Sequence, residues 1–372
     1  MPANLAEILP RVPVSCFWEI TDACNLRCIH CEADAGRKSP DELSTAEALS
    51  LADQLAEVGC ERVCLTGGEP LLRSDWPTIA ARLSDRGLNV TVITNGMLVD
   101  PPAIERMVEV GVHALSVSID GDRAVHDAIR LAAGRSQASS YDGVLRAIEL
   151  SAASPLKTAA ITQIHRANID DLPRMYEQMV ELGVDAWQVQ ICMPLGRLLK
   201  YRHQYLIDPA QLPDLHSRLA ELVEDGRMPV IVADNIGYYG RQEPTLRRSA
   251  QGTKSFWCGC MAGCRVVAFC ANGDVKGCPS HPREFVVGNI RERPLAEIWG
   301  EPERFAYNTA FDETLLTGGC ARCPFRKLCR AGCTSMAYAV TGTIYDNPFC
   351  IQRVQGEDAE VEVSETKETA ER

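Results

Sequence analysis

Three cysteines near the beginning of the chain have a spacing that suits a metal or iron–sulfur site. Cys24, Cys28 and Cys31 lie in the stretch CNLRCIHC, and the next cysteine along the chain is Cys60. Zinc sites usually take four cysteine or histidine ligands. Three thiolates suit a [4Fe–4S] cluster better, because they would hold three irons and leave the fourth open to an outside ligand. A zinc knuckle is the alternative interpretation.

Further residues that could bind a ligand follow the cysteine stretch at intervals. The stretch LTGGEPLL contains two adjacent glycines, which allow a backbone to approach a ligand closely. An arginine further along, in VHDAIR, could form a two-pronged pair with a carboxylate. The candidate ligand-binding residues are Gly67, Gly68, Glu69, Thr94, Asn95, Ser118, Asp120 and Arg130.

The C-terminal part of the chain is rich in cysteine. Ten of the 17 cysteines lie between residues 258 and 350. They are Cys258, Cys260, Cys264, Cys270, Cys278, Cys320, Cys323, Cys329, Cys333 and Cys350. Small loop-rich modules of this kind need metal or cross-links for stability. We therefore predict a separate small domain over residues 255–352, followed by an acidic disordered tail over 356–372.

Composition narrows the possible partners and the compartment. The chain has 372 residues and a net charge of −12, which argues against a nucleic-acid or anionic membrane partner. No apolar run approaches the ~20 residues of a membrane span, and the first residues do not resemble a signal peptide. We expect a soluble, cytoplasmic protein. In a reducing compartment, cysteines are better explained by metal binding or catalysis than by disulfides.

The elements that must position these residues alternate between strands and helices. Short apolar runs rich in β-branched residues predict strands at 14–20, 62–67, 89–94, 114–119, 157–162 and 186–191. Helices are predicted near 44–58, 74–86, 102–110, 140–152 and 169–182, with a later helix near 209–225 and a strand at 228–233. This alternation predicts a parallel sheet, either open or curved into a partial barrel. Ligands then bind at the carboxyl ends of the strands, where the first cysteine stretch lies.

Together these motifs resemble the radical S-adenosylmethionine (SAM) superfamily and its SPASM members. The spacing C-x3-C-x2-C and the GGEP stretch carry the first resemblance, and His30 stands where that superfamily usually has an aromatic or imidazole ring. The C-x2-C-x5-C-x3-C run from Cys320, with Gly273 ahead of Cys278, carries the second. The resemblance implies an α/β fold, a partial (β/α)6 TIM barrel over residues 14–235 with a SPASM domain after it.

The resemblance also implies cofactors and their ligands. SAM would chelate the open iron of a [4Fe–4S] cluster on Cys24, Cys28 and Cys31, and Arg130 would pair with its carboxylate. One auxiliary cluster would take Cys320, Cys323, Cys329 and Cys350. A second would take Cys260, Cys278 and Cys333, with a fourth ligand from Cys258, Cys264 or Cys270, or with an open iron.

The implied activity is that of a radical SAM oxidoreductase. Such enzymes cleave SAM reductively, with an electron donor such as a flavodoxin or ferredoxin, and abstract a hydrogen atom from the substrate. SPASM members mostly modify peptides or proteins by cross-linking, epimerisation or oxidation. Only 13 residues precede the first expected strand, too few for the leader-binding domain of many peptide maturases. A small molecule such as a sugar, alcohol or tetrapyrrole (haem precursor) is therefore the alternative substrate.

Three further interpretations accompany this one. Cys192, just after the sixth predicted strand, could donate a hydrogen atom to a substrate radical. An aspartate that serves as a base in sulfatase-maturing members is not carried over, because Pro279 stands directly after Cys278. A non-catalytic iron–sulfur electron carrier and a zinc-stabilised binding module are the alternatives from other functional classes.

Overall fold

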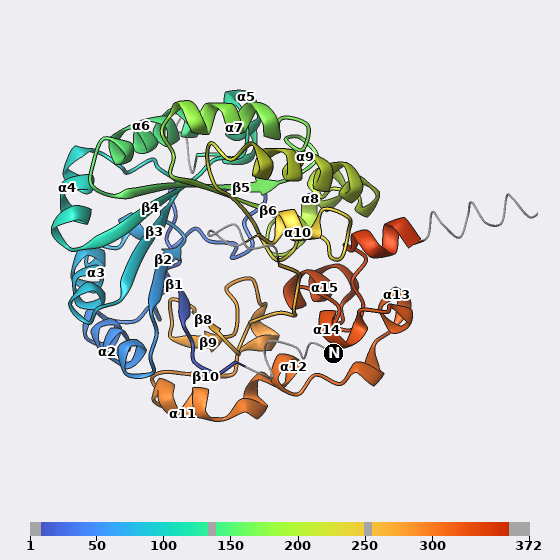
Figure 1. The fold of residues 1–372 in the computed structure, drawn as a ribbon. Coiled ribbons are helices and arrows are strands. Elements are labelled where there is room, and N and C mark those ends of the chain that lie inside the picture. The colour runs from blue at the N-terminus through green and yellow to red at the C-terminus, as the bar shows by residue number, and fades with distance from the viewer. Residues whose placement is uncertain (1–8, 133–138, 249–254, 357–372) are drawn as a thin grey trace, which may run out of the picture.

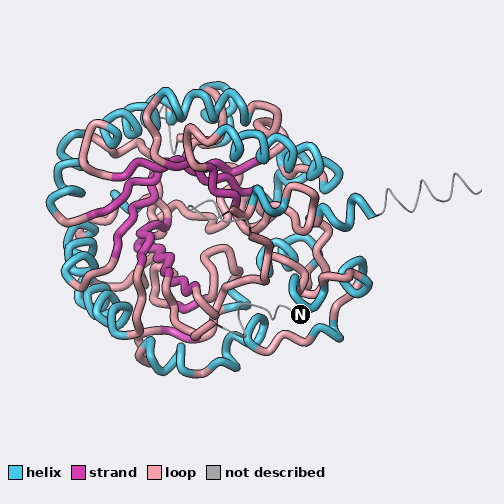
Figure 2. Tube along the Cα trace, in the orientation of Figure 1, coloured by secondary structure: helices cyan, strands magenta, loops and turns pink. Residues whose placement is uncertain are grey.

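The computed structural model describes residues 9–132, 139–248 and 255–356. A single curved sheet forms its centre, with helices along the outer face (Figures 1 and 2). The strand order is β10-β9-β8-β1-β2-β3-β4-β5-β6-β7, and every neighbouring pair from β8 to β7 is parallel. The sheet is open rather than closed, which confirms the predicted partial barrel.

The bounds of the elements are as follows. The strands are β1 Ser15–Thr21, β2 Arg62–Gly67, β3 Asn89–Thr94, β4 Val112–Ser118, β5 Lys157–Ile164, β6 Ala186–Ile191, β7 Val230–Val232, β8 Val266–Phe269, β9 Asp274–Lys276 and β10 Gly288–Asn289. The barrel helices are α2 Thr45–Glu57, α3 Trp76–Asp85, α4 Pro101–Glu109, α5 Arg123–Ile129, α6 Ser140–Ala152, α7 Leu172–Glu181, α8 Leu198–Tyr205 and α9 Leu212–Asp225. Shorter helices follow: α10 Glu243–Leu246, α11 Leu295–Gly300, α12 Ala306–Thr309, α13 Gly318–Arg322, α14 Arg326–Cys329 and α15 Thr334–Thr341.

The six predicted barrel strands and the helices between them are confirmed, with ends shifted by a few residues. Helix α2 shows why the prediction succeeded: Ser44 and Glu47 form a reciprocal capping box at its start. Helices α5 and α8 were not predicted. Helix α5 has only seven residues, and α8 buries Leu198 alone, so neither has an apolar pattern strong enough to detect.

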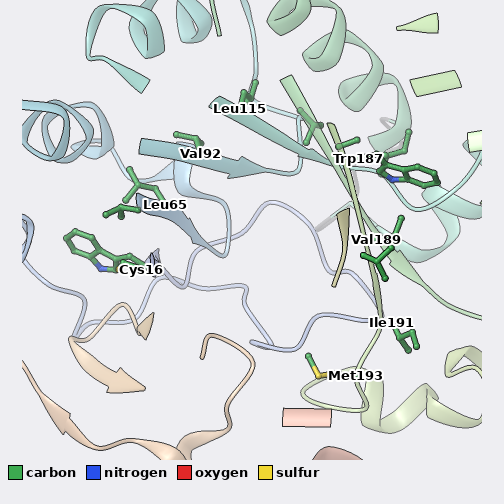
Figure 3. Packing of buried hydrophobic residues seen from close by; sticks show 14 of the residues in the cluster. Cys16, Leu65, Val92, Leu115, Trp187, Val189, Ile191 and Met193 are labelled. Carbon is green, nitrogen blue, oxygen red and sulfur yellow. The ribbon is translucent and has the colours of Figure 1, made fainter. Parts of the chain in front are cut away.

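Side chains along each barrel strand alternate between two environments. One set, which includes Cys16, Leu65 and Val92, is buried against the outer helices, as Figure 3 shows. On β6, Trp187 and Val189 belong to the same buried set. Because successive side chains on a strand point to opposite faces, the residues between them point into the barrel interior. The sheet therefore builds the protein core on one face and a chamber on the other.

The C-terminal region shares this sheet. Strand β8 pairs in parallel with β1, in a register that places Ser15 opposite Val266. The Phe269 ring meets the Trp18 ring edge to face, with centroids 6.4 Å apart, and both residues are fully buried. The predicted domains at 14–235 and 255–352 are thus joined by one continuous sheet.

Two predictions concern other parts of the chain. Apart from Gly356, the predicted acidic tail lies outside the described residues. Among the helices in the described ranges, none has the length and apolar character that a membrane crossing requires.

The β1–β8 junction gives a testable prediction. Phe269→Ala removes a buried ring at this junction and should cost about 3–5 kcal/mol of folding free energy. The measurement is thermal unfolding of the anaerobically reconstituted protein, followed by circular dichroism. Phe256 is 53% exposed, so Phe256→Ala is the matched control and should change the midpoint little. Equal midpoints for the two variants would contradict the role assigned to the junction.

Candidate active site

The first cysteine group lies on the loop that follows β1, at the carboxyl ends of the parallel strands. Cys24, Cys28 and Cys31 line one cavity of about 220 Å³. The N–H of Leu26 points at the Cys24 sulfur, 3.4 Å away, and the Asn95 amide lies 3.9 Å from the same atom. The structure therefore brings the three predicted thiols together at the functional end of the sheet.

The glycine pair after β2 holds this loop through its backbone. The N–H of Gly68 donates to Thr21 O, and the N–H of Glu69 donates to Ala23 O, both over 2.7 Å. A Cβ on Gly67 would lie 2.3 Å from Thr21 O, and one on Gly68 would lie 2.1 Å from Ala23 O. Gly67 also has φ +135°, a conformation that favours glycine. Both positions require glycine because the loop after β1 passes directly against them.

Six of the eight predicted ligand-binding residues line the same cavity as the cysteines. They are Gly67, Gly68, Thr94, Asn95, Ser118 and Arg130. The other two, Glu69 and Asp120, are fully buried behind the cavity wall. Their carboxylates accept hydrogen bonds from residues that line the cavity, so they can hold those residues in place.

Glu69 organises the ends of two strands. Its carboxylate accepts hydrogen bonds from the Thr94 hydroxyl and the Asn95 N–H, each over 2.8 Å, and from the N–H of Leu71. Burial raises the pKa of Glu69 to about 7, and these donors partly offset that rise. The carboxylate thus fixes Thr94 at the end of β3 and Asn95 directly after it, which both line the cavity.

Asp120 sits between Arg130 and His30. It accepts from Arg130 Nε and from His30 Nε2, the latter over 3.2 Å, and from the N–H of Gln163 over 2.8 Å. Burial raises the pKa of Asp120, but the charge and the hydrogen bond of Arg130 outweigh it and hold that pKa below its ordinary value. Burial lowers the pKa of His30 to about 3, so His30 donates as a neutral ring. The network orients Arg130 at the cavity wall.

Sequence reasoning missed two residues that hold the cysteine loop from the far side of the barrel. Arg197 donates from Nε to Cys28 O over 2.9 Å, and its N–H donates to Cys31 O over 3.0 Å. Gly196 has φ +51°, and a Cβ there would lie 2.4 Å from Cys31 O. The stretch PLGR after β6 is the only local signal for this clamp, and nothing in it indicates a partner 160 positions earlier.

A larger chamber of about 500 Å³ adjoins the first cavity. The two share lining residues, among them Ser118, Arg130 and Gln163. On its other side, the chamber is lined by Cys260, Cys278, Cys333, Pro279, Ser280 and Ser335 from the C-terminal region. The first cysteine group and one C-terminal cysteine group therefore face a common interior.

The structure separates the candidates for the fourth ligand of that C-terminal group. Cys264 is buried, and burial raises the pKa of its thiol. The nearby thiol of Cys260 raises that pKa further. Cys258 instead donates to Phe256 O over 3.2 Å and lines a different cavity. Cys270 interacts with the Glu19 side chain.

The other C-terminal group also comes together. Cys320, Cys323, Cys329 and Cys350 line one cavity of about 260 Å³ near the surface. Within the described ranges, no three histidine, cysteine or acidic side chains converge tightly enough for a single metal ion. The thiol groups are spread around hollows instead, an arrangement that suits iron–sulfur clusters, which are larger than an ion.

Cys192 has no such access. It is fully buried at the end of β6 and lines neither the first cavity nor the chamber. Burial raises the pKa of its thiol well above the ordinary value. Its proposed part as a hydrogen-atom donor stays a prediction.

This chain is similar to known proteins, to some in sequence and to others in fold. A family model described as the radical SAM superfamily matches residues 18–179, and one described as an iron–sulfur cluster-binding domain, SPASM, matches residues 260–324. An AdoMet-dependent heme synthase of Methanosarcina barkeri is 31% identical over 355 residues, covering 93% of this chain and 98% of the relative. A PqqA peptide cyclase of Granulibacter bethesdensis is 27% identical, covering 91% and 87%. A structure of anSMEcpe with bound AdoMet and a peptide superposes with a TM-score of 0.69 at 17% identity, covering 92% and 94%.

The clamp from β6 gives a testable prediction. Gly196→Ala places a Cβ against Cys31 O and should displace the cysteine loop. The reconstituted variant should lose about four irons per chain, one cluster's worth, measured by iron and sulfide analysis. Gly300→Ala is the matched control, because a Cβ there meets no heavy atom within 4 Å. Full iron content in Gly196→Ala would contradict the clamp.

Proposed function

This chain belongs to the radical SAM superfamily and has a C-terminal SPASM domain, and we propose that it abstracts a hydrogen atom from a peptide or protein substrate. Its cofactors are SAM and [4Fe–4S] clusters. When bound, the first cluster and SAM supply a 5′-deoxyadenosyl radical, which is the species that removes hydrogen. The observation that carries the proposal is the chamber of about 500 Å³ between the first cysteine group and the C-terminal one.

The chain's own residues would divide the work between binding and positioning. Cys24, Cys28 and Cys31 would hold the first cluster. The backbone of Gly67 and Gly68 leaves room for SAM, and Arg130 would receive its carboxylate. The other residues around SAM would be Thr94, Asn95 and Ser118, with Glu69 and Asp120 holding them from behind. The barrel wall would keep water from the radical.

We also propose cysteine ligands for the two auxiliary clusters, from the cavities that the C-terminal cysteines line. One cluster would take Cys320, Cys323, Cys329 and Cys350. The other would take Cys260, Cys278 and Cys333, and Cys264 is the fourth ligand that we propose, because it lies next to Cys260.

The lining of the chamber supports a peptide. The side chains of Gln163, Gln188 and Gln190 line it, and their carboxamides can both donate to and accept from peptide groups. The side-chain oxygen of Gln163, Oε1, is buried without a hydrogen-bond partner in the described part of the protein. A buried acceptor of this kind needs a donor, and a substrate N–H would supply one.

Charge also favours this substrate. Three acidic side chains line the chamber, Glu19, Glu32 and Asp234, against one basic side chain, Arg130. Since Arg130 pairs with Asp120 and is assigned above to the carboxylate of SAM, little positive charge remains to receive an anionic substrate. Burial raises the pKa of all three side chains, that of Glu32 to about 7. A neutral peptide segment avoids repulsion from those that are ionised.

A haem-type tetrapyrrole is the second candidate. The Methanosarcina barkeri relative favours it, because that protein is a heme synthase and this chain covers 98% of it. Against it, the carboxylates of a coproporphyrin would meet the acidic lining of the chamber.

The first cluster assignment gives one prediction. Cys28→Ala should abolish 5′-deoxyadenosine formation from SAM and dithionite, because the first cluster loses a ligand, while iron in the C-terminal region remains. The measurements are chromatography of the nucleoside products and iron analysis. Cys64→Ala, at a cysteine outside all the groups, is the control and should retain turnover. Turnover by Cys28→Ala would contradict the assignment.

The substrate class gives another prediction. The reconstituted enzyme, SAM and dithionite are mixed either with peptides encoded beside its gene or with Fe-coproporphyrin III, and products are followed by mass spectrometry. We expect a peptide to lose hydrogen, or to exchange it with heavy water, together with 5′-deoxyadenosine formation. Conversion of the tetrapyrrole alone would replace the first candidate by the second.

A further inference from the structure

The surface over Cys320, Cys323, Cys329 and Cys350 has the charge and shape of a docking site. We propose that an acidic electron-carrier protein of the flavodoxin class docks there and reduces the enzyme. The proposal rests on the function proposed above, since it supplies the electron that SAM cleavage consumes. It also goes further than that function, because it proposes that the electron enters the protein at this surface rather than at the mouth of the barrel.

Two of the four cysteines, Cys320 and Cys323, lie close to solvent, and Cys329 and Cys350 are buried beneath them. The cavity that they line is also lined by Arg322, Arg326 and Arg353. Cys320 and Cys323 are partly exposed, and Arg322 between them is exposed. A donor seated on this rim would approach the ligands of one cluster through a thin layer of protein.

Positive charge gathers on the same rim. The segment 317–330, TGGCARCPFRKLCR, contains four basic residues and no acidic residue, in a chain whose net charge is −12. The nearby acidic residues pair with basic residues other than Arg322 and Arg326. Glu313 pairs with Lys327 over 3.4 Å, and Asp346 pairs with Arg353 over 3.1 Å. No acidic partner is found for Arg322 or Arg326 among residues 9–132, 139–248 and 255–356, so both remain available to an acidic partner.

An apolar centre adjoins this charge. The Phe325 ring stacks flat on Tyr239, with centroids 4.2 Å apart, and is still 36% exposed. Leu315, in the 3-10 turn Glu313–Leu315 that packs beside α13, is 50% exposed. An apolar centre with a charged rim suits a small transient interface, in which charge steers the encounter.

The protein connects this surface with the chamber through Tyr238. The Tyr238 hydroxyl accepts from the N–H of Cys333, over 2.6 Å, and the Cys350 thiol lies 3.9 Å from Tyr238 O. Cys350 belongs to the surface group and Cys333 to the group that faces the chamber. One buried residue thus contacts both groups.

The proposed transfer involves electrons alone. The reduced flavin of the donor loses one electron, and one cluster of this chain gains it, with no bond made or broken. Transfer from the surface group through the inner group then leads toward the first cysteine group.

The test is the double charge reversal Arg322→Glu with Arg326→Glu. Flavodoxin is titrated onto the anaerobically reconstituted enzyme at low and high salt, and oxidation of flavodoxin hydroquinone is followed by stopped-flow absorbance. We expect binding to weaken about tenfold or more at low salt, with a flatter salt dependence and a slower flavodoxin oxidation. The matched control reverses Arg86, directly after α3, and Arg106 in α4, two exposed arginines away from this surface, and should bind as the wild type does.

SAM cleavage with dithionite as the reductant tests the proposed function independently of the docking site. It reduces the clusters without a docked protein, so the double variant should still cleave SAM with dithionite and keep its iron. Wild-type flavodoxin affinity and oxidation rate in the double variant would overturn the docking site, as would an equal loss in the control. Absence of SAM cleavage by the wild-type enzyme with dithionite would overturn the proposed function instead. Binding of an acidic peptide but not of flavodoxin would assign the surface to another partner.

Discussion

The contact between the end of β2 and the loop after β1 is the constraint on which the site depends. Two backbone hydrogen bonds, from Gly68 to Thr21 and from Glu69 to Ala23, join these segments. Both require the absence of a side chain at Gly67 and Gly68, because a Cβ at either position would overlap a carbonyl oxygen. The same lack of side chains leaves backbone facing the cavity, so the packing that anchors the cysteine loop also keeps this part of the cavity open.

A second layer of buried polar groups keeps this arrangement rigid. Glu69 and Asp120 are both fully buried, and each accepts several hydrogen bonds from groups that line the cavity or lie next to it. A buried carboxylate is costly unless its oxygens are satisfied, so these two residues hold their neighbours in defined positions. Their hydrogen bonds orient Thr94, Asn95 and Arg130, and neither carboxylate lines the cavity itself.

Alternation along parallel strands then determines what the substrate meets. Residues such as Trp187 and Val189 face the outer helices, while Gln188 and Gln190, which alternate with them, face the chamber. Strand β8 extends the sheet beyond β1 and brings the C-terminal cysteines to the opposite wall. The chamber thus lies between two cysteine groups, and its lining is acidic and rich in side-chain amides.

The sequence by itself determined the local features of this protein. The apolar runs predicted six strands, the alternating pattern predicted the helices between them, and cysteine spacing indicated which thiols share a site. These features depend on neighbours a few residues apart, which a linear pattern records. Tertiary structure alone decided that Gly196 and Arg197 clamp the cysteine loop and that Glu69 and Asp120 lie behind the cavity. The reason is that such contacts join residues from different strands and loops, and no short-range pattern specifies which distant segments the curvature of the sheet brings together.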